Sequence, residues 1–341
     1  MSVAQFKSSE AREHRAAEKS RFLTAFAALT GLILSLLIAA PARAAEECGP
    51  EDNAIVCENS KPGSPWTEWD IDGAGDDSIQ GFAADISVNV GEPIDFKIDT
   101  DASAYSIDIY RTGWYNGLGA RKITSISPSA QLPQIQPECL TDVATELTDC
   151  GTWDISATWE VPSDAVSGVY LAKLTRTDTG GSSHITFIVR NESSTSQVLF
   201  QTSDPTWHAY NLYGGSDFYS GADNGRAFKI SYNRPFATRD GVEARDFYFG
   251  AEYPLVRFLE RNGYDVSYFS GVDTDRHGDL LTNHNVFLSV GHDEYWSGAQ
   301  RSNVEAARDA GVNLQFLSGN EVYWRTRYEP SMAGTLQKRI Q

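Results

Sequence analysis

One short segment near the C-terminal end carries residue types that are suited to chemistry. An apolar run, Val286–Gly291, is followed directly by His292, Asp293 and Glu294. Side chains alternate along an extended backbone, so His292 and Glu294 are expected to point to the same side. An imidazole and a carboxylate on one side can bind a metal ion or share a proton. The alternative is a structural role, in which Asp293 or Ser297 caps the helix that follows.

The second half of the chain predicts the elements that position this segment. Apolar runs alternate with two segments of helical spacing, and a glycine stands where each helix should end. This alternation is typical of βαβ units, whose strand ends gather at one edge of a sheet, where ligands bind. We therefore expect a mostly parallel, doubly wound α/β domain. The expected strands are Val198–Thr202, Tyr264–Phe269, His284–Val290 and Val312–Leu317, and the expected helices are Glu252–Asn262 and Ser297–Ala310.

The first half predicts an immunoglobulin-like antiparallel β-sandwich. Short alternating segments are separated by clusters of Gly, Pro, Asp and Asn, the pattern of strands joined by turns. A polar stretch at Arg190–Gln197 divides the two halves. We expect residues 1–44 to be a signal peptide, 45–77 a disulfide-containing extension, 78–192 the sandwich and 193–341 the α/β domain. The expected strands of the sandwich are Ala84–Val90, Ile94–Ile98, Ser106–Tyr110, Gly168–Leu174 and Ser183–Val189.

The first 44 residues predict an export signal. Basic residues precede the uncharged stretch Phe22–Ala40, and the tripeptide that ends at Ala44 has the small-x-small pattern of a cleavage site. We expect the mature chain to be secreted or periplasmic, with no membrane association after cleavage. Because the uncharged stretch is near the length that spans a bilayer, an uncleaved anchor is the alternative.

Charge and cysteine content exclude several functions. Residues 1–44 hold six basic and three acidic residues, so the remaining 22 basic and 43 acidic residues give the mature chain a formal charge of −21. Such a surface repels nucleic acid and anionic lipid, and no phosphate-binding glycine motif supports a nucleotide. Cys48 and Cys57, and Cys139 and Cys150, form two close pairs that favour local disulfides in an oxidising compartment, although the two other connectivities remain open. No cysteine follows Cys150, which excludes a thiol nucleophile in the second half.

Four motifs in the second half resemble one family, that of the N,N-dimethylformamidase large (beta) subunit and its relatives. They read TWHAYNLYGG, EYPLVRFLERNGYDVSY, VGHDEYWS and LSGNEVYWR, in that order, between Gln197 and Tyr328. The resemblance concerns the C-terminal domain of that subunit. It implies the fold more strongly than the substrate, because one fold hosts many reactions.

The resemblance also implies a mononuclear iron held by two tyrosinates and one glutamate, with a histidine and an asparagine nearby. On this sequence Glu294 would be the carboxylate ligand, Tyr210 the first tyrosine and Tyr253 the second. His292 would exchange protons and Asn320 would orient the substrate, unless Asn320 is only a turn residue. Phenolate and carboxylate oxygens are hard ligands that suit Fe³⁺. Alternatives are Tyr213 and Tyr248 for the second tyrosine and Glu321 for the carboxylate.

These expectations leave three functions open. The first is a metal-dependent hydrolase that cleaves a C–N amide bond of a small or peptide-like substrate. The second is an extracytoplasmic glycan-binding protein whose aromatic side chains stack on sugar, and the third is a non-catalytic cell-surface protein. The resemblance implies a small partner subunit or a homo-oligomer. Because the family domain normally continues beyond the last motif, we also expect this α/β domain to be incomplete at its C-terminal end.

Overall fold

The computed structural model describes residues 48–237, 246–334 and 339–340. The predicted export signal at residues 1–44 lies outside these ranges. Glu47–Gln341 form one compact unit. Among the helices of the described ranges, none has both the length and the apolar character that crossing a bilayer requires.

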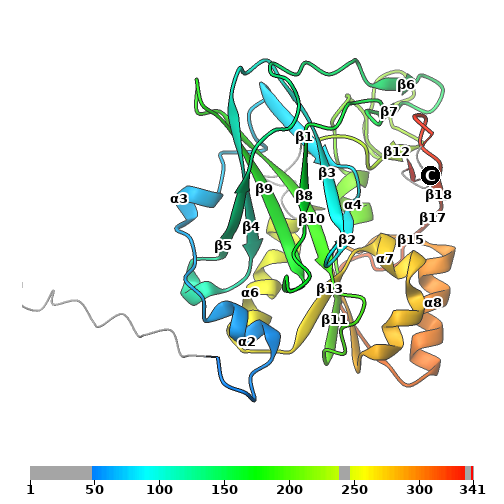
Figure 1. The fold of residues 1–341 in the computed structure, drawn as a ribbon. Helices are drawn as coiled ribbons and strands as arrows, with labels where there is room; N and C mark the ends of the chain where they lie inside the picture. The colour runs from blue at the N-terminus through cyan, green and yellow to red at the C-terminus, as the bar shows by residue number, and fades with distance from the viewer. Residues whose placement is uncertain (1–47, 238–245, 335–338, 341) are drawn as a thin grey trace, which may run out of the picture. The chain divides into compact units, whose positions relative to one another are not determined.

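The first half of the chain folds into two sheets that enclose an apolar core (Figure 1). The smaller sheet contains, in spatial order, β1 (Ile79–Ala83), β3 (Pro93–Thr100) and β8 (Ala157–Glu160). The larger contains β2 (Ser87–Asn89), β10 (Ser182–Arg190), β9 (Gly168–Arg176), β4 (Tyr105–Thr112) and β5 (Ala120–Ile126). Alternate residues of β3 are buried, including Phe96 and Ile98. The larger sheet is mixed rather than antiparallel, because β2 pairs with β10 in parallel.

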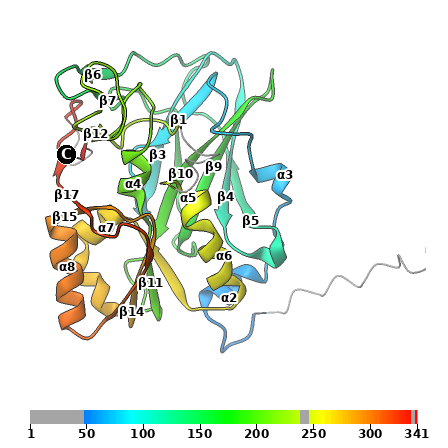
Figure 2. The same ribbon diagram turned by 180° about the vertical axis from the view of Figure 1, so that it is seen from behind.

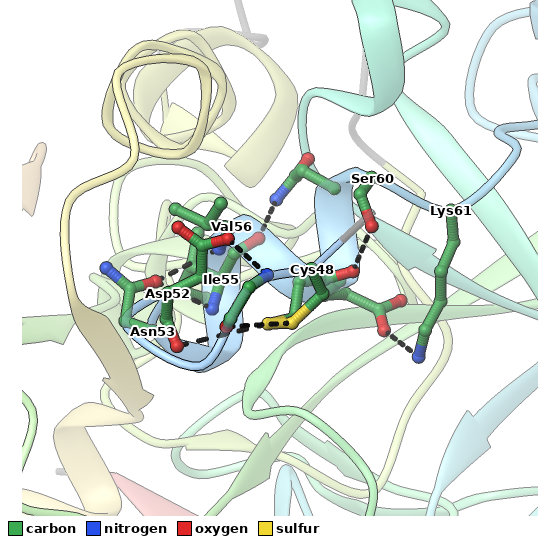
Figure 3. The surroundings of a disulfide bond; sticks show 11 residues. Cys48, Asp52, Asn53, Ile55, Val56, Ser60 and Lys61 are labelled. Atoms are coloured by element: carbon green, nitrogen blue, oxygen red, sulfur yellow. Dashed lines mark hydrogen bonds and ion pairs between the residues drawn. A yellow bond between two sulfur atoms is a disulfide. The ribbon is translucent and has the colours of Figure 1, made fainter. Parts of the chain in front are cut away.

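Both local disulfides predicted from the cysteine spacing are confirmed. Cys139–Cys150 closes a hairpin formed by β6 (Leu140–Asp142) and β7 (Leu147–Asp149). Cys48–Cys57 ties the start of the described chain to helix α2 (Ala54–Asn59). Figure 3 shows how Asn53 begins this helix: its Oδ1 accepts hydrogen bonds from two backbone N–H groups of the first turn at 3.0 Å. The described start of the extension is thus a capped, cross-linked helix.

The second half contains a four-stranded sheet in which every pair is parallel. Its spatial order is β13 (Val266–Phe269), β11 (Val198–Gln201), β14 (Val286–Gly291) and β16 (Asn313–Ser318). The two predicted helices are present as α6 (Tyr253–Arg261) and α8 (Gly298–Asp309). Ser297 caps α8 in a reciprocal arrangement with Gln300, which confirms one of the structural roles expected near the GHDEYW segment.

The expectation of a doubly wound parallel α/β domain is wrong. Strands dominate the described residues, helix makes up only 20%, and apart from one parallel two-stranded pair the other sheets are antiparallel or mixed. One apolar cluster contains Leu171 and Ile188 of the larger sandwich sheet together with Phe200 and Leu288 of the parallel sheet. The sandwich therefore packs against one face of the parallel sheet. In a doubly wound domain, helices of the domain itself would cover that face. A buried apolar strand has the same sequence pattern under either cover, which is why the sequence could not separate the two.

Helix α8 lies beside the parallel sheet (Figure 2). A separate apolar cluster joins this helix to the other side of the sheet. It contains Leu199 and Phe287 of the strands, Val304 of α8 and Leu281 of the 3₁₀ helix η3 (Gly278–Asn283). The remaining helices are α3 (Trp66–Trp69), η1 (Tyr115–Gly117), α4 (Asp204–Ala209), α5 (Tyr248–Ala251) and α7 (Gly271–Arg276). The remaining strands are β12 (Ile230–Ser231), β15 (Tyr295–Ser297), β17 (Trp324–Thr326), β18 (Tyr328–Glu329) and β19 (Arg339–Ile340).

A buried ion pair fastens α6 to the sandwich. The Arg111 side chain on β4 and the Glu260 side chain on α6 are both fully buried. The Arg111 Nη1 and Nη2 atoms donate to the two carboxylate oxygens of Glu260 at 2.9 and 2.8 Å. Tyr268 and Asn59 donate to the same carboxylate, so its oxygens are well satisfied. Removing one partner would leave an uncompensated charge in the core.

We expect Arg111→Met to lower the free energy of unfolding by about 3–5 kcal/mol, because Glu260 would remain buried and unpaired. Adding Glu260→Gln should recover part of this loss, since the glutamine is neutral and its remaining oxygen can still accept a hydrogen bond from Tyr268 or Asn59. Urea denaturation of the two single variants and the double variant gives the coupling energy. Strictly additive effects would show that the charges do not interact.

Candidate functional site

The parallel pair of β11 and β14 brings two distant parts of the chain to one edge of the sheet. Their register pairs Gln201, the last residue of β11, with Ser289, two residues before the end of β14. After β11 the chain enters α4, and Tyr210 is the residue at the C-terminal end of that short helix. After β14 the chain continues into His292 and Glu294. This edge of the sheet therefore holds three residues of the predicted metal site, namely Tyr210, His292 and Glu294.

Gly291 is required at the end of β14. It has a φ of +90°, in the region where residues with a side chain are strained. A Cβ atom at this position would lie 2.9 Å from both Glu252 Cδ and Ser203 Oγ. The glycine thus allows the chain to turn tightly over buried side chains before it presents His292.

Three tyrosines gather around the carboxylate of Glu294, and we call these four residues the tyrosine–glutamate cluster. Tyr210 donates a hydrogen bond to Glu294 Oε2 at 3.0 Å, and Tyr219 donates to Oε1 at 2.7 Å. Tyr295 in turn donates to the hydroxyl of Tyr219. The rings of Tyr210 and Tyr219 are stacked with centroids 4.5 Å apart. Two phenol oxygens and one carboxylate thus converge from three segments of the chain.

His292 lies between two carboxylates at the border of this cluster. Its Nε2 is 3.3 Å from Glu294 Oε2, on the same side as the alternation of side chains predicts. Its Nδ1 is 2.7 Å from Asp246 Oδ1. Because a carboxylate accepts the Nδ1 proton, Asp246 favours the tautomer in which Nε2 is free to exchange a proton toward the cluster.

The cluster has the chemistry of a site for a hard cation. Glu294 is 3% exposed, and its carboxylate has no lysine or arginine partner among the described residues. Burial, followed by the hydrogen bond with Tyr219, raises the pKa of Tyr210. Burial also raises the pKa of Tyr219. Both phenols thus keep their protons, which a metal ion would replace. No group of three or more His, Cys, Asp or Glu in the described ranges could hold a metal, so a metal here depends on tyrosine oxygens.

Other residues predicted for the site are placed elsewhere. Tyr253, expected as the second tyrosine ligand, is directed to the sandwich, where its hydroxyl donates to the Gly119 carbonyl at 2.9 Å. The hydroxyl of Tyr248 likewise bonds to Thr112. Asn320 is exposed and has a φ of +54° in the loop after β16, the conformation of a turn residue. This loop runs beside the GHDEYW segment, but no contact joins Asn320 to the cluster. Glu321 and Tyr213 also lie outside the cluster.

The sequence prediction missed Tyr219, Tyr295 and Asp246. Tyr295 follows Glu294 directly, so adjacency was the available signal. Tyr219 lies in a loop with no regular period, and the carboxylate of Asp217 fixes it by accepting from the Tyr219 and Ser220 backbone N–H groups. Its approach to Glu294 depends on how this loop folds back, which spacing does not reveal.

Comparison with known proteins defines the family. The model of the family "N,N-dimethylformamidase beta subunit-like, C-terminal" matches residues 106–341, which is more than half of the chain. The chain belongs to this family. The N,N-dimethylformamidase beta subunit of Paracoccus aminophilus is 28% identical over 147 residues, covering 41% of this chain and 19% of that protein. The similarity thus spans about a fifth of the length of this relative.

Similarity to solved structures is low. A polysaccharide monooxygenase, CBM33, has 16% identity and a TM-score of 0.18, with coverage of 30% of this chain and 57% of the other. Domain 1 of VCBP3 from Branchiostoma floridae has 10% identity and a TM-score of 0.22, with coverage of 35% and 98%. These scores support no conclusion about fold or function.

The tyrosine–glutamate cluster rests on buried carboxylates that help to place α4. Asp204, in the first turn of α4, is fully buried and accepts hydrogen bonds from the Gly271 backbone N–H and the Tyr232 hydroxyl. Burial raises its pKa to about 7. Glu252 accepts from Ser203 and Trp207, and burial raises its pKa to about 7 as well. Both groups therefore favour the protonated form in the folded state.

We expect the folded state to lose stability as the pH rises through about 7. The stabilising effect of protonating Asp204 is complete below its usual pKa of 3.8 and is lost through the folded value of about 7. The difference between these two pKa values corresponds to at most about 4 kcal/mol of unfolding free energy. Asp204→Asn keeps the shape and should flatten the fall in unfolding free energy between about pH 4 and pH 7. Denaturation of this variant and of the exposed control Asp223→Asn measures the effect; equal pH profiles would contradict it.

Proposed function

We propose that this protein is a metal-dependent hydrolase that cleaves a C–N amide bond. The observation that carries the proposal is the convergence of the Tyr210 and Tyr219 hydroxyls on the two oxygens of the buried Glu294 carboxylate. Membership of the dimethylformamidase beta subunit-like family supports an amide as the substrate class. Relative to the sequence prediction, the proposal retains Tyr210 and Glu294 and replaces Tyr253 with Tyr219.

We propose iron, as Fe³⁺, for this site, held by Tyr210, Tyr219 and Glu294. All three donors are oxygens, which suit a hard trivalent ion better than a soft one. Such an ion, when bound, would act as a Lewis acid and polarise an amide carbonyl. Replacing two phenol protons with a cation would also neutralise the carboxylate that now has no lysine or arginine partner.

His292 is the group that we assign to proton transfer. Hydrolysis forms a C–O bond from water to the carbonyl carbon, breaks the C–N bond and delivers a proton to the departing nitrogen. His292 Nε2 faces the cluster, so it can take the proton of the attacking water and return it to the amine. Asp246 holds the opposite nitrogen and fixes the ring orientation. Asp246 is thus a positioning residue.

We also propose that the protein acts outside the cytoplasm and with a second subunit. The two disulfides support an oxidising compartment, in line with the predicted export signal. The relative from Paracoccus aminophilus is described as a beta subunit, which supports a partner chain or a homo-oligomer. Secretion or periplasmic localisation can be tested by fractionating cells and locating the protein.

Metal analysis tests the ligand set. We expect the purified protein to bind about one iron per chain and to show a visible tyrosinate-to-iron charge-transfer band. Tyr219→Phe and Glu294→Ala should each lose most of the iron, because each removes one of the three oxygen donors. Elemental analysis and the absorption spectrum measure both effects.

Tyr253→Phe is the matched control for this experiment. It also removes one buried phenol oxygen, but one that bonds to the Gly119 carbonyl rather than to Glu294. Iron content should therefore stay unchanged in this variant. Loss of iron in Tyr253→Phe with retention in Tyr219→Phe would restore the ligand set predicted from the sequence, and no iron in any folded form would overturn the metal proposal.

The role of Asp246 is separable from metal binding. We expect Asp246→Asn to lower kcat about 10–100-fold, because the amide no longer favours the correct tautomer of His292. His292→Gln should lower kcat further, by about 10²–10⁴-fold. Iron content should remain nearly unchanged in both. A variant that loses iron together with activity would place His292 among the metal ligands instead.

A further inference from the structure

A pocket adjoins the tyrosine–glutamate cluster and shares two of its residues. It has a volume of about 210 Å³, and Tyr219 and Tyr295 form part of its wall. Phe218, Phe228 and Trp324 supply apolar surface, and we call this site the Trp324 pocket. A cavity of about 150 Å³ holds benzene in another protein, so the Trp324 pocket has room for an aromatic ring.

The walls of the pocket are tied to the backbone that carries Glu294. β15 and β17 pair in parallel with Tyr295 opposite Trp324, and the Trp324 backbone N–H donates to the Glu294 carbonyl at 2.9 Å. The rings of Phe218 and Tyr295 have centroids 5.3 Å apart. A group bound in the pocket therefore lies beside the cluster, on walls that are largely formed in advance.

Two arginines give the pocket a positive charge. Arg226 and Arg325 line it, and its lining contains no carboxylate. The Arg226 guanidinium carbon lies 5.0 Å from the centroid of the Phe228 ring. Neither guanidinium makes an ion pair or hydrogen bond with another described residue. In a chain of formal charge −18, two exposed arginines at one pocket, with no ion-pair partner in the described part of the chain, indicate an anionic ligand.

We propose that the Trp324 pocket binds a substrate amide that joins an aromatic ring to a carboxylate, as in an N-aroyl amino acid. The inference rests on the proposed hydrolase function and names the substrate class of that site. The ring would stack on the apolar wall, and the planar guanidinium groups would bind the carboxylate. The scissile amide, between ring and carboxylate, would then face the shared tyrosines and Glu294.

Binding of N-benzoylglycine to the purified protein, measured by isothermal titration calorimetry, tests this proposal. Benzamide has the ring without the carboxylate, and N-acetylglycine has the carboxylate without the ring. We expect N-benzoylglycine to bind at least tenfold more tightly than either, because only it engages both parts of the pocket. Equal affinity for benzamide and N-benzoylglycine, or no binding of N-benzoylglycine, would overturn the proposal.

Variants locate the binding site. Arg226→Gln and Arg325→Gln should each weaken N-benzoylglycine binding about tenfold, since each removes a charge-assisted contact. The matched control is Arg308→Gln, an exposed arginine paired with Asp309 at the end of α8 and away from the pocket. The affinity of this variant for N-benzoylglycine should equal that of the unaltered protein. Equal weakening in the control would show a general charge effect and overturn the assignment to this pocket.

Glu294→Ala distinguishes failure of this proposal from failure of the proposed function. It removes a metal ligand but none of the residues that line the pocket. If no metal is found while N-benzoylglycine still binds through Arg226 and Arg325, the hydrolase proposal fails and the pocket for an anionic aromatic ligand stands. If iron binds but N-benzoylglycine does not, the pocket proposal fails alone.

Discussion

The buried pair of Arg111 and Glu260 sets the position of α6, and α6 links the two parts of the fold. Burying an ion pair has an unfavourable desolvation free energy, which the attraction between the two charges roughly offsets. The main effect of this pair is therefore on orientation rather than on net stability. The two guanidinium nitrogens fit the two carboxylate oxygens in a single arrangement. Helix α6 can therefore pack on strand β4 in only one register.

The opposite end of α6 carries this constraint to the candidate site. Glu252, the residue before the helix, accepts hydrogen bonds from Ser203 and Trp207 at the start of α4. Helix α4 in turn ends at Tyr210. The same glutamate lies so close to Gly291 that a side chain there would not fit. A chain of buried polar contacts thus connects the sandwich to the cluster of tyrosines.

The site combines an oxygen-rich centre with an apolar, positively charged neighbour. Glu294 is buried beside three tyrosines, and Tyr219 and Tyr295 belong both to this cluster and to the Trp324 pocket. A cation at the first and the carboxylate of an aromatic ligand at the second would complement one another electrostatically. Because Tyr219 lines the pocket and donates a hydrogen bond to Glu294, a displacement of its side chain by a bound ligand would alter the hydrogen bonding of that carboxylate.

The sequence by itself determined the local features. Cysteine spacing predicted both disulfides, apolar periodicity predicted the four strands of the parallel sheet together with α6 and α8, and the motifs predicted the family. These depend on neighbours within a few residues or on the order of motifs along the chain. The sequence also placed His292 and Glu294 on one side, because alternation along an extended segment is local.

Only the tertiary structure decided which distant residues meet. The sandwich, rather than a second layer of helices, shares one core with the parallel sheet, a choice that apolar strand patterns leave open. Tyr219 rather than Tyr253 reaches Glu294, because a loop without regular period folds back while α6 holds Tyr253 against Gly119. Asp246 meets His292 across 46 residues of chain. Such contacts arise from packing between elements, which the spacing of residues along the chain does not encode.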